Sequence, residues 1–261
     1  MRVFLDGLIS DMVLTYPERC IVYLPSAVLT DEQLQSLNVS YQATFFWKQH
    51  LCKHASIITD VFCSQLIHTT VCSTCGFTKH RFDQVCDLAV GIIQPISVYD
   101  IVSLQDCLKH FTIEEILTND NMVHCDQCAQ KRETTKTCKV GRFPKVLIIN
   151  LKRFRFVTAT YTSEKVTTEI DIPLSNFDVG MLMACQHLSS ESDAVYDLYA
   201  VCNHHGNSVE NGHYTTDCIV SPVGEWYKFD DQYVSLTTDL DLCGKDAYIL
   251  FYIKQGNNSI S

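Results

Sequence analysis

The feature that most constrains the fold is a series of β-rich segments in the second half of the chain. From Lys136 onward, apolar and β-branched runs are separated by short polar loops. They are KTCKV, KVLIINLKRF, TTEIDIP, YDLYAVCN, GHYTTDCIV, EWYKFDD and AYILFYIK. Runs of this composition and length are typical of strands, and short connections favour antiparallel neighbours. The sequence therefore predicts a mainly antiparallel sheet after Lys136.

The first half of the chain carries helical patterns instead. In VFLDGLISDM the apolar residues recur at helical spacing, which predicts an amphipathic helix that ends before Pro17. Thr30 and Gln33 are spaced as a capping box and predict a helical region that continues through the aromatic cluster around Trp47. The first of these helices, VFLDGLISDM, has no N-capping residue before its apolar face, so the chain has the pattern of one that begins inside a helix.

A second capping signal, Ser103 with Asp106, predicts another helix. The residues expected to be buried on it are Leu104, Cys107, Leu108 and Phe111. QHLSSESDAV, near residues 186–195, reads as a surface loop. Helices followed by a mainly antiparallel sheet predict the α+β class.

Composition and charge narrow the class of protein. With 261 residues, 46% of them hydrophobic, the chain can form one large domain or two small ones. No apolar run approaches the roughly 20 residues that span a bilayer, and Asp6 interrupts the opening segment where a signal peptide would be apolar. We expect an intracellular protein of the cytoplasm or nucleus with no membrane partner. The formal net charge of −10 argues against nucleic acid and suits a neutral or basic partner.

Two Cys-x-x-Cys pairs stand out among the fourteen cysteines: Cys72 with Cys75, and Cys125 with Cys128. Each pair can present two thiolates to one ion, and four thiolates fill the tetrahedral shell of a structural Zn²⁺. The alternatives are a redox pair or ordinary core cysteines. We predict a zinc site and expect the other ten cysteines to be thiols, mostly in apolar surroundings.

His213 follows a glycine at the head of a strand-like run. On a strand its side chain shares a face with Thr215 and Asp217, whereas Cys218 faces the other way and cannot be its nucleophile. Asp230, followed by Asp231, ends the next strand-like run, and a carboxylate there could orient the imidazole of a general base. Two alternatives are a purely structural His-Asp pair and a metal cluster of His213 with the neighbouring histidines at 204 and 205.

Taken together, the sequence resembles the catalytic domain of the ubiquitin-specific proteases from about Phe4 to Lys254. The blocks that carry the resemblance are CSTCG, HCDQCAQKRETTK, FPKVLIINLKRF, YDLYAVCNHHGNSVENGHYTT, EWYKFDD and AYILFYIK. That family cleaves ubiquitin from proteins at its carboxyl-terminal glycine with a Cys-His-Asp/Asn triad. The resemblance implies that His213 is the general base, that Asp230 orients it and that Asp231 supports the site. Ubiquitin and ubiquitinated proteins are the implied partners.

The resemblance also implies the fold of that family, a papain-like hand with thumb, palm and fingers. Residues 1–65 would be a helical remnant of a truncated thumb, and residues 66–140 would form the fingers with the zinc knuckles. Residues 141–254 would form the palm with the His and Asp of the triad, and residues 255–261 a tail. Together these parts would make one domain.

The chain departs from the family at its N-terminal end. The family's nucleophile lies in a box of the type Gly-Asn-Thr-Cys-Tyr, and none of the cysteines outside the Cys-x-x-Cys pairs follows such a turn. These cysteines are Cys20, Cys52, Cys63, Cys86, Cys107, Cys138, Cys185, Cys202, Cys218 and Cys243. The opening segment resembles a helix that the family carries well downstream of its nucleophile. We therefore expect the chain to begin after the nucleophile and to be inactive alone.

Three hypotheses fit this pattern. The first is a deubiquitinating thiol protease represented by an incomplete chain, through truncation, alternative splicing or an incomplete gene model. The second is a pseudoenzyme that binds ubiquitin without cutting it, and the third is a zinc-stabilised interaction module with no ubiquitin role. Because His213 and Asp230 are both retained, we favour the first hypothesis over the second.

Overall fold

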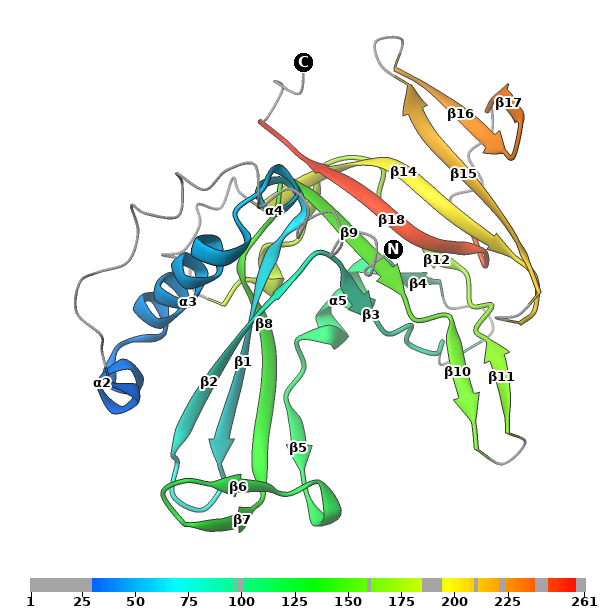
Figure 1. Ribbon diagram of the computed structural model, residues 1–261. Coiled ribbons are helices and arrows are strands. Elements are labelled where there is room, and N and C mark those ends of the chain that lie inside the picture. The colour runs from blue at the N-terminus through cyan, green and yellow to red at the C-terminus, as the bar shows by residue number, and fades with distance from the viewer. Residues whose placement is uncertain are drawn as a thin grey trace. The chain divides into compact units, whose positions relative to one another are not determined.

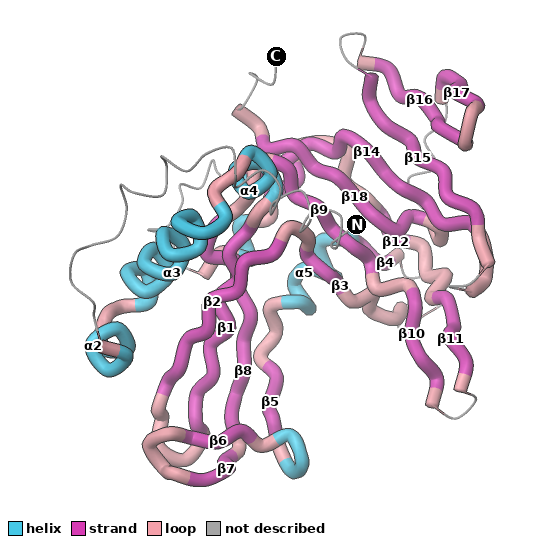
Figure 2. Tube along the Cα trace, in the orientation of Figure 1, coloured by secondary structure: helices cyan, strands magenta, loops and turns pink. Residues whose placement is uncertain are grey.

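The computed structural model describes residues 30–95, 97, 101–158, 161–184, 194–208, 211–220, 224–237 and 244–256. The described residues fall into two units, the first drawn from segments 1–86, 112–145 and 180–193 and the second from segments 87–111, 146–179 and 194–261. A few helices and many strands form these units (Figure 1, Figure 2), so the α+β class is confirmed. The expected divisions of the chain into thumb, fingers, palm and tail stay predictions.

Three helices belong to the first unit: α2 (Asp31–Ser36), α3 (Val39–His54) and α4 (Ile57–Phe62). The capping box at the start of α2 is confirmed, because Thr30 Oγ1 accepts from the backbone N–H of Gln33 while Gln33 Oε1 accepts from that of Thr30. The predicted helical region through Trp47 is present, but as two helices, because the backbone is extended at residues 37 and 38. Asn38 Oδ1 accepts from the N–H of Tyr41 and begins α3, a role that suits asparagine better than a helix interior. The helix expected before Pro17 lies outside the described residues.

Strands of the first unit form a sheet in the order β2-β1-β8-β5 and a separate hairpin. The sheet contains β1 (Ser64–Cys72), β2 (Thr78–Val85), β5 (Glu115–Leu117) and β8 (Thr134–Arg142), and the hairpin contains β6 (Val123–Cys125) and β7 (Gln130–Arg132). All these pairs are antiparallel. The expectation that strands begin only at Lys136 is wrong, because SQLIHTTVC, rich in β-branched residues, already forms β1.

Helix α3 packs on one face of this sheet. Ile67 of β1 lies directly opposite Phe82 of β2, and both are buried in a cluster with Ala43 of α3. The ring of Phe46 stacks on that of Phe82 with centroids 4.9 Å apart. Gln65, also buried, donates from Nε2 to the carbonyl oxygen of Ala43. Apolar burial together with this hydrogen bond from Gln65 Nε2 therefore holds the helix on the sheet.

The second unit contains a large sheet in the order β17-β16-β15-β14-β18-β9-β3, built from most of the strands predicted after Lys136. The prediction is wrong for two runs, because KTCKV lies in β8 of the first unit and TTEIDIP does not join this sheet. Its strands are β3 (Leu88–Val90), β9 (Val146–Leu151), β14 (Val195–His205), β15 (His213–Val220), β16 (Glu225–Asp230), β17 (Tyr233–Leu236) and β18 (Ala247–Lys254), and β13 (Phe177–Asp178) pairs with β14. Only the β3–β9 pair on this path is parallel. Buried residues such as Leu147, Ile149 and Leu250 give the central strands their apolar core.

Shorter elements complete both units. In the second unit these are β4 (Val102–Ser103), α5 (Leu104–Phe111), β10 (Phe154–Val157), β11 (Thr162–Lys165) and β12 (Ile170–Asp171), and in the first unit the 3-10 turns η2 (Asn119–Asn121) and η3 (Gly180–Leu182). The predicted start of α5 is confirmed, because Ser103 Oγ accepts from the N–H of Asp106. Leu104, Cys107 and Leu108 are buried as expected, whereas Phe111 is half-buried.

Most of the loop expected near residues 186–195 lies outside the described residues. Among the helices that the structure describes, none has the length and apolar character needed to cross a membrane.

Candidate active site and candidate metal centre

The pairing of three strands positions His213. β14 and β15 pair antiparallel, and the final pair of their ladder joins His205 to His213. β16 pairs with the other edge of β15 and ends at Asp230. Because side chains alternate along a strand, His213, Thr215 and Asp217 share one face of β15, as predicted from the sequence.

His213 and Asp230 meet on this face. The Nε2 atom of His213 lies 2.5 Å from Oδ1 of Asp230. The bond to Asp230 raises the pKa of His213, and the same bond lowers the pKa of Asp230. Since a carboxylate only accepts, Nε2 carries the proton and Nδ1 is left as the nitrogen that can take up another. The sequence-predicted base and its orienting residue are therefore brought together.

Asp231 also lies beside the imidazole. One carboxylate oxygen of Asp231, one of Asp230 and one ring nitrogen of His213 all lie within 4.8 Å of one another. Asp231 occupies the left-handed backbone region with φ 51°, in the turn between β16 and β17. Its negative charge adds to the increase in the pKa of His213. A second acidic group thus favours the protonated imidazole.

The two histidines of β14 have other surroundings. His204 is buried, and its ring has edge contacts with Phe154, Tyr214 and Tyr248. Burial and the nearby charge of a lysine lower the pKa of His204, which keeps it neutral. A β-carbon added to Gly212 would overlap this ring, so the residue before His213 must be glycine for the two segments to approach this closely.

The metal cluster of three histidines is not formed. Among the described residues, the groups of potential ligands within 4.8 Å of one another do not include His204 or His205. The ring of His205 instead lies nearly parallel to that of His213, with centroids 6.5 Å apart and an interplanar angle of 25°.

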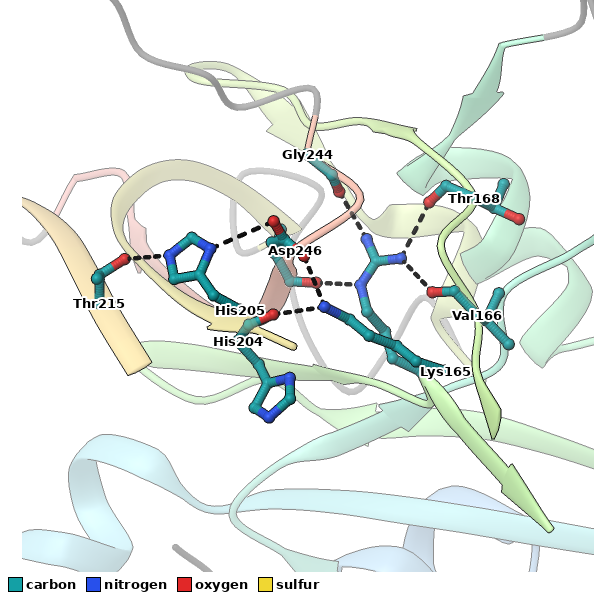
Figure 3. Close-up of polar contacts among 10 residues, drawn as sticks. Lys165, Val166, Thr168, His204, His205, Thr215, Gly244 and Asp246 are labelled. Carbon is teal, nitrogen blue, oxygen red and sulfur yellow. Dashed lines mark hydrogen bonds and ion pairs between the residues drawn. The ribbon is translucent and has the colours of Figure 1, made fainter. Parts of the chain in front are cut away.

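A polar network that no local sequence pattern predicts joins these strands to β11 and to the residue before β18 (Figure 3). Asp246 accepts from Lys165 Nζ at 2.6 Å, and its second oxygen lies 3.3 Å from Nδ1 of His205. Lys165 also donates to the carbonyl oxygen of His204. Arg153, the arginine of LKRF, is fully buried and donates to four backbone carbonyls. No local pattern indicates these contacts, because the partners lie far apart in the sequence.

The four cysteines of the Cys-x-x-Cys pairs form the candidate metal centre. Their sulfur atoms all lie within 4.8 Å of one another, and Cys75 Sγ is 3.6 Å from Cys125 Sγ. Cys72 ends β1 and Cys125 ends β6, so each pair spans a tight turn. The backbone N–H of Cys128 donates to Cys125 Sγ. Hydrogen bonds from the backbone of Cys75 lower the pKa of Cys72 to about 6. The predicted set is brought together and could bind a metal ion.

The described part of the chain provides no cysteine sulfur within hydrogen-bond distance of the His213 ring. Cys218 lies on β15 but on the opposite face from His213, as expected. Cys20, Cys185 and Cys243 lie outside the described residues.

Comparison with known proteins identifies the family. The model of the family described as ubiquitin carboxyl-terminal hydrolase matches residues 1–252. The chain belongs to this family. The resemblance predicted from the sequence is thereby confirmed.

Individual relatives support the assignment of the chain to the ubiquitin carboxyl-terminal hydrolase family. Ubiquitin carboxyl-terminal hydrolase 2 of Gallus gallus is 34% identical over 254 residues, which are 97% of this chain and 66% of that protein. Ubiquitin carboxyl-terminal hydrolase 21 of Mus musculus is 35% identical over 211 residues, or 81% of this chain and 36% of that protein. The chain thus spans less than two thirds of the length of these relatives.

Solved structures share the fold. A chain in the SAGA DUB module of Ubp8, Sgf11, Sus1 and Sgf73 bound to monoubiquitin has a TM-score of 0.61 and 25% identity, covering 82% of this chain and 47% of that chain. A chain in the yeast SAGA DUBm with an Sgf73 mutant has a TM-score of 0.63 and 26% identity, covering 85% and 48%. The fold expected from the resemblance, that of the ubiquitin-specific proteases, is therefore confirmed.

Proposed function

We propose that this chain belongs to a cysteine-type deubiquitinase, which hydrolyses peptide and isopeptide bonds at the carboxyl-terminal glycine of ubiquitin. The single observation that carries the proposal is the 2.5 Å contact between His213 Nε2 and Asp230 Oδ1, in a chain whose family is named for this reaction. A thiol protease needs an imidazole held in one tautomer, and this contact provides it.

Each residue has a defined role in the proposed reaction. Nδ1 of His213 takes the proton of a cysteine thiol, and the thiolate attacks the carbonyl carbon of the terminal glycine. The protonated imidazole then gives that proton to the departing amine. Asp230 orients the ring and stabilises its charged form, and Asp231 adds negative charge nearby. Water releases the glycine carboxylate from the resulting thioester with His213 again acting as base.

We further propose that the nucleophile is not among the fourteen cysteines of this sequence, so that the 261 residues alone are inactive. Two observations support this. No cysteine follows a Gly-Asn-Thr turn, and Cys218, the cysteine nearest to His213 along the same strand, lies on its opposite face. In a comparable triad, removal of the nucleophile costs on the order of a millionfold in rate.

A ubiquitin probe with a thiol-reactive end tests the absence of the nucleophile. We expect the 261-residue protein to form no covalent adduct and to cleave no ubiquitin conjugate, whereas a form that includes a Gly-Asn-Thr-Cys box should do both. His213→Ala should abolish both activities in that longer form. Labelling of the present chain at one cysteine, lost in His213→Ala, would contradict the absence of a nucleophile but would support the roles of His213 and Asp230.

The metal of the four-cysteine group is proposed to be one structural Zn²⁺. Tetrahedral coordination with Zn–S bonds of about 2.3 Å requires sulfur atoms about 3.8 Å apart. The 3.6 Å between Cys75 and Cys125 is close to that value. A set of four sulfur donors also favours zinc over oxygen-preferring ions such as Mg²⁺ and Ca²⁺. Zinc would hold the β6–β7 hairpin against the end of β1.

Metal analysis tests the zinc proposal. Protein purified without added zinc should contain close to one equivalent, and Cys125→Ser should remove it. Cys138→Ser is the matched control, because Cys138 lies on β8, in the sheet that also contains Cys72, but outside the four-cysteine group. A protein without metal, or metal retained in Cys125→Ser, would contradict the assignment.

Ubiquitin is the proposed partner, with ubiquitinated proteins as substrates of the complete enzyme. The family and the solved module bound to monoubiquitin support this, and the net charge of −10 suits a neutral or basic partner. Titration of isotope-labelled ubiquitin with the protein should shift ubiquitin signals. Binding without cleavage in the longer form would support the pseudoenzyme, and no shift at high protein concentration would support an interaction module without a ubiquitin role. The expected location in cytoplasm or nucleus stays a prediction.

A further inference from the structure

His213 is an exposed side chain that packing alone does not hold. Its side chain is 48% exposed and that of Asp230 is 45% exposed. An imidazole in this position can rotate about two side-chain bonds, and a single hydrogen bond to Asp230 fixes only one edge of the ring. A base must be held close to its productive orientation. A second contact is therefore needed to define the plane of the ring.

In the described part of the chain, the ring of His205 supplies such a contact. His205 and His213 are directly opposite in the β14–β15 ladder, and their rings lie nearly parallel, 25° apart, with centroids separated by 6.5 Å. Side chains directly opposite on one face of an antiparallel pair are close enough to restrict each other. The His205 ring can thus limit the rotation of His213 about the axis that Asp230 leaves free.

His205 is itself held at both ring nitrogens, as Figure 3 shows. Nε2 lies 2.8 Å from the hydroxyl of Thr215, and Nδ1 lies 3.3 Å from Oδ2 of Asp246. Because a carboxylate only accepts, Nδ1 donates to Asp246, which leaves Nε2 for the bond with the hydroxyl of Thr215. Thr215 is buried on β15, two residues from His213. The ring beside His213 is therefore fixed from two different elements.

Asp246 is anchored in turn. Lys165, whose side chain is 2% exposed, donates to Asp246 at 2.6 Å, and the backbone N–H of His204 donates to the carbonyl oxygen of Asp246. Although burial opposes ionisation of Asp246, the bonds from Lys165 and His205 hold its pKa below the ordinary value. The network thus keeps a charged acceptor at Nδ1 of His205.

We propose that His205 is a positioning residue, which fixes the ring plane of His213 through Thr215 and Asp246. It touches neither the reacting atoms nor the substrate in this assignment. The inference rests on the proposed function, because it takes His213 as the base, but its test follows the orientation of His213 directly and needs no catalytic activity.

The pKa of His213, measured by nuclear magnetic resonance titration, should change in opposite directions on removal of His205 if His205 positions the ring and if it only shields the ring from water. The charged groups that face His213 are Asp230 and Lys228 of β16 and Asp231 of the following turn, with the ring of His205 on β14. The bond to Asp230 is the largest influence on the pKa of His213 and raises it, whereas burial lowers it. If His205 only covered His213, its removal would admit water and raise the pKa further. If it positions the ring, its removal weakens the bond to Asp230 and the pKa falls toward 6.5.

Three variants test whether His205 positions His213. We expect His205→Ala to lower the pKa of His213 and to speed exchange of the Nε2 proton. His205→Gln, whose planar amide can donate to Asp246 and accept from Thr215, should restore most of both. Tyr199→Ala, at a partly exposed position on the same strand, should change neither. An unchanged or raised pKa in a folded His205→Ala variant would overturn the proposal.

If His205→Ala does not fold, Thr215→Val is used in its place. Thr215→Val removes only the hydroxyl that bonds Nε2 of His205, so it should lower the pKa of His213 by a smaller amount. No shift in that variant would also overturn the proposal. The proposed function fails separately: a wild-type His213 without a raised pKa, unaffected by Asp230→Asn, would show that the base and its carboxylate are not paired in solution. A paired His213 that is insensitive to His205 would refute only the positioning role.

Discussion

Arg153 is the residue whose removal should destabilise the second unit most clearly. Its side chain is fully buried and donates to the carbonyl oxygens of Ala247, Val166, Thr168 and Gly244, at 2.5, 2.9, 3.0 and 2.7 Å respectively. Burial lowers its pKa to about 10, so it remains charged at neutral pH. These bonds join β18 and the residues before it to the segment that follows β11.

The expected loss follows from two opposing terms. Hydrogen bonds from a charged donor are worth roughly 1.5 to 3 kcal/mol each, so four give about 6 to 12 kcal/mol. Desolvation of the guanidinium opposes this by several kcal/mol, and removal of one member of a buried charged set typically costs about 3 to 5 kcal/mol. Arg153→Met keeps the apolar stem but leaves four carbonyls without their donor. We expect its free energy of unfolding to fall by about 3 to 5 kcal/mol.

Urea unfolding can be followed in the correct unit, because the chain has two tryptophans, Trp47 in the first unit and Trp226 in the second. In a Trp47→Phe background the fluorescence of Trp226 reports the unit that contains Arg153, which avoids assuming one transition for both units. Arg155→Met is the matched control, since its pair with Glu164 is exposed and should be worth about 0 to 1 kcal/mol. A loss below about 1 kcal/mol for Arg153→Met, or an equal loss for the control, would refute the reasoning.

Three other expectations concern the two sites. Because the pKa of His213 is raised, its contribution to the free energy of unfolding is complete below pH about 6.5 and is lost as the pH rises through the raised pKa. Because the pKa of Asp230 is lowered, its contribution is lost as the pH falls through that lowered pKa. Urea midpoints from acid to alkaline pH should show this maximum and lose it in Asp230→Asn; identical profiles would contradict the pairing. Gly212→Ala should drive a β-carbon against the ring of His204 and displace His213, so its resonances should move, and unmoved resonances would refute the close approach. Chelation should open the four Cys-x-x-Cys thiols to alkylation while Cys138, whose pKa burial raises to about 11, stays slow at neutral pH. Mass spectrometry of the alkylated protein checks this, and equal labelling of Cys138 would contradict it.

Local signals in the sequence predicted local structure well. The capping box at Thr30 and the serine that begins α5 depend on residues three apart, and both are confirmed. Most strands after Lys136 could also be predicted, because central strands of the large sheet have continuous or alternating apolar residues. The same reasoning predicted that His213 and Asp230 lie at adjacent ends of neighbouring strands, and in the structure their side chains are in contact.

Long-range pairing accounts for what the sequence did not reveal. β1 pairs with β8, about 70 positions later, and its mixed polar and β-branched pattern does not by itself distinguish a strand from the helical region before it. The break at Asn38 was missed because an asparagine within an otherwise helical pattern is read as a weak helix former unless its cap is seen. The contact of Lys165 with Asp246 joins positions 81 apart, which no periodicity encodes.

Three of the blocks that carry the family resemblance contribute the candidate base, its carboxylate or a buried support of the same unit, and this has a physical reason. LKRF contributes the buried Arg153, GHY contributes Gly212 and His213, and EWYKFDD contributes Asp230. An exposed imidazole beside an exposed carboxylate gains little orientation from packing, so its orientation must come from neighbouring side chains such as His205 and from the backbone that carries them. Four carbonyls held by one buried guanidinium fix segments that flank the end of β14, and the histidine ring beside Gly212 fixes the approach of β15.

A module that only bound a partner through its surface would not need this arrangement. Buried charged groups such as Arg153 and Lys165 have a desolvation cost, and a complete buried charged set often adds little net stability over apolar side chains that replace all of its members. Orientation of His213 is the benefit that offsets that cost in the proposed enzyme. If the chain were an interaction module, loosening His213 by His205→Ala would leave every function intact. In the complete enzyme the same substitution should reduce kcat with little effect on ubiquitin binding, because base orientation matters in the transition state and not in the bound complex.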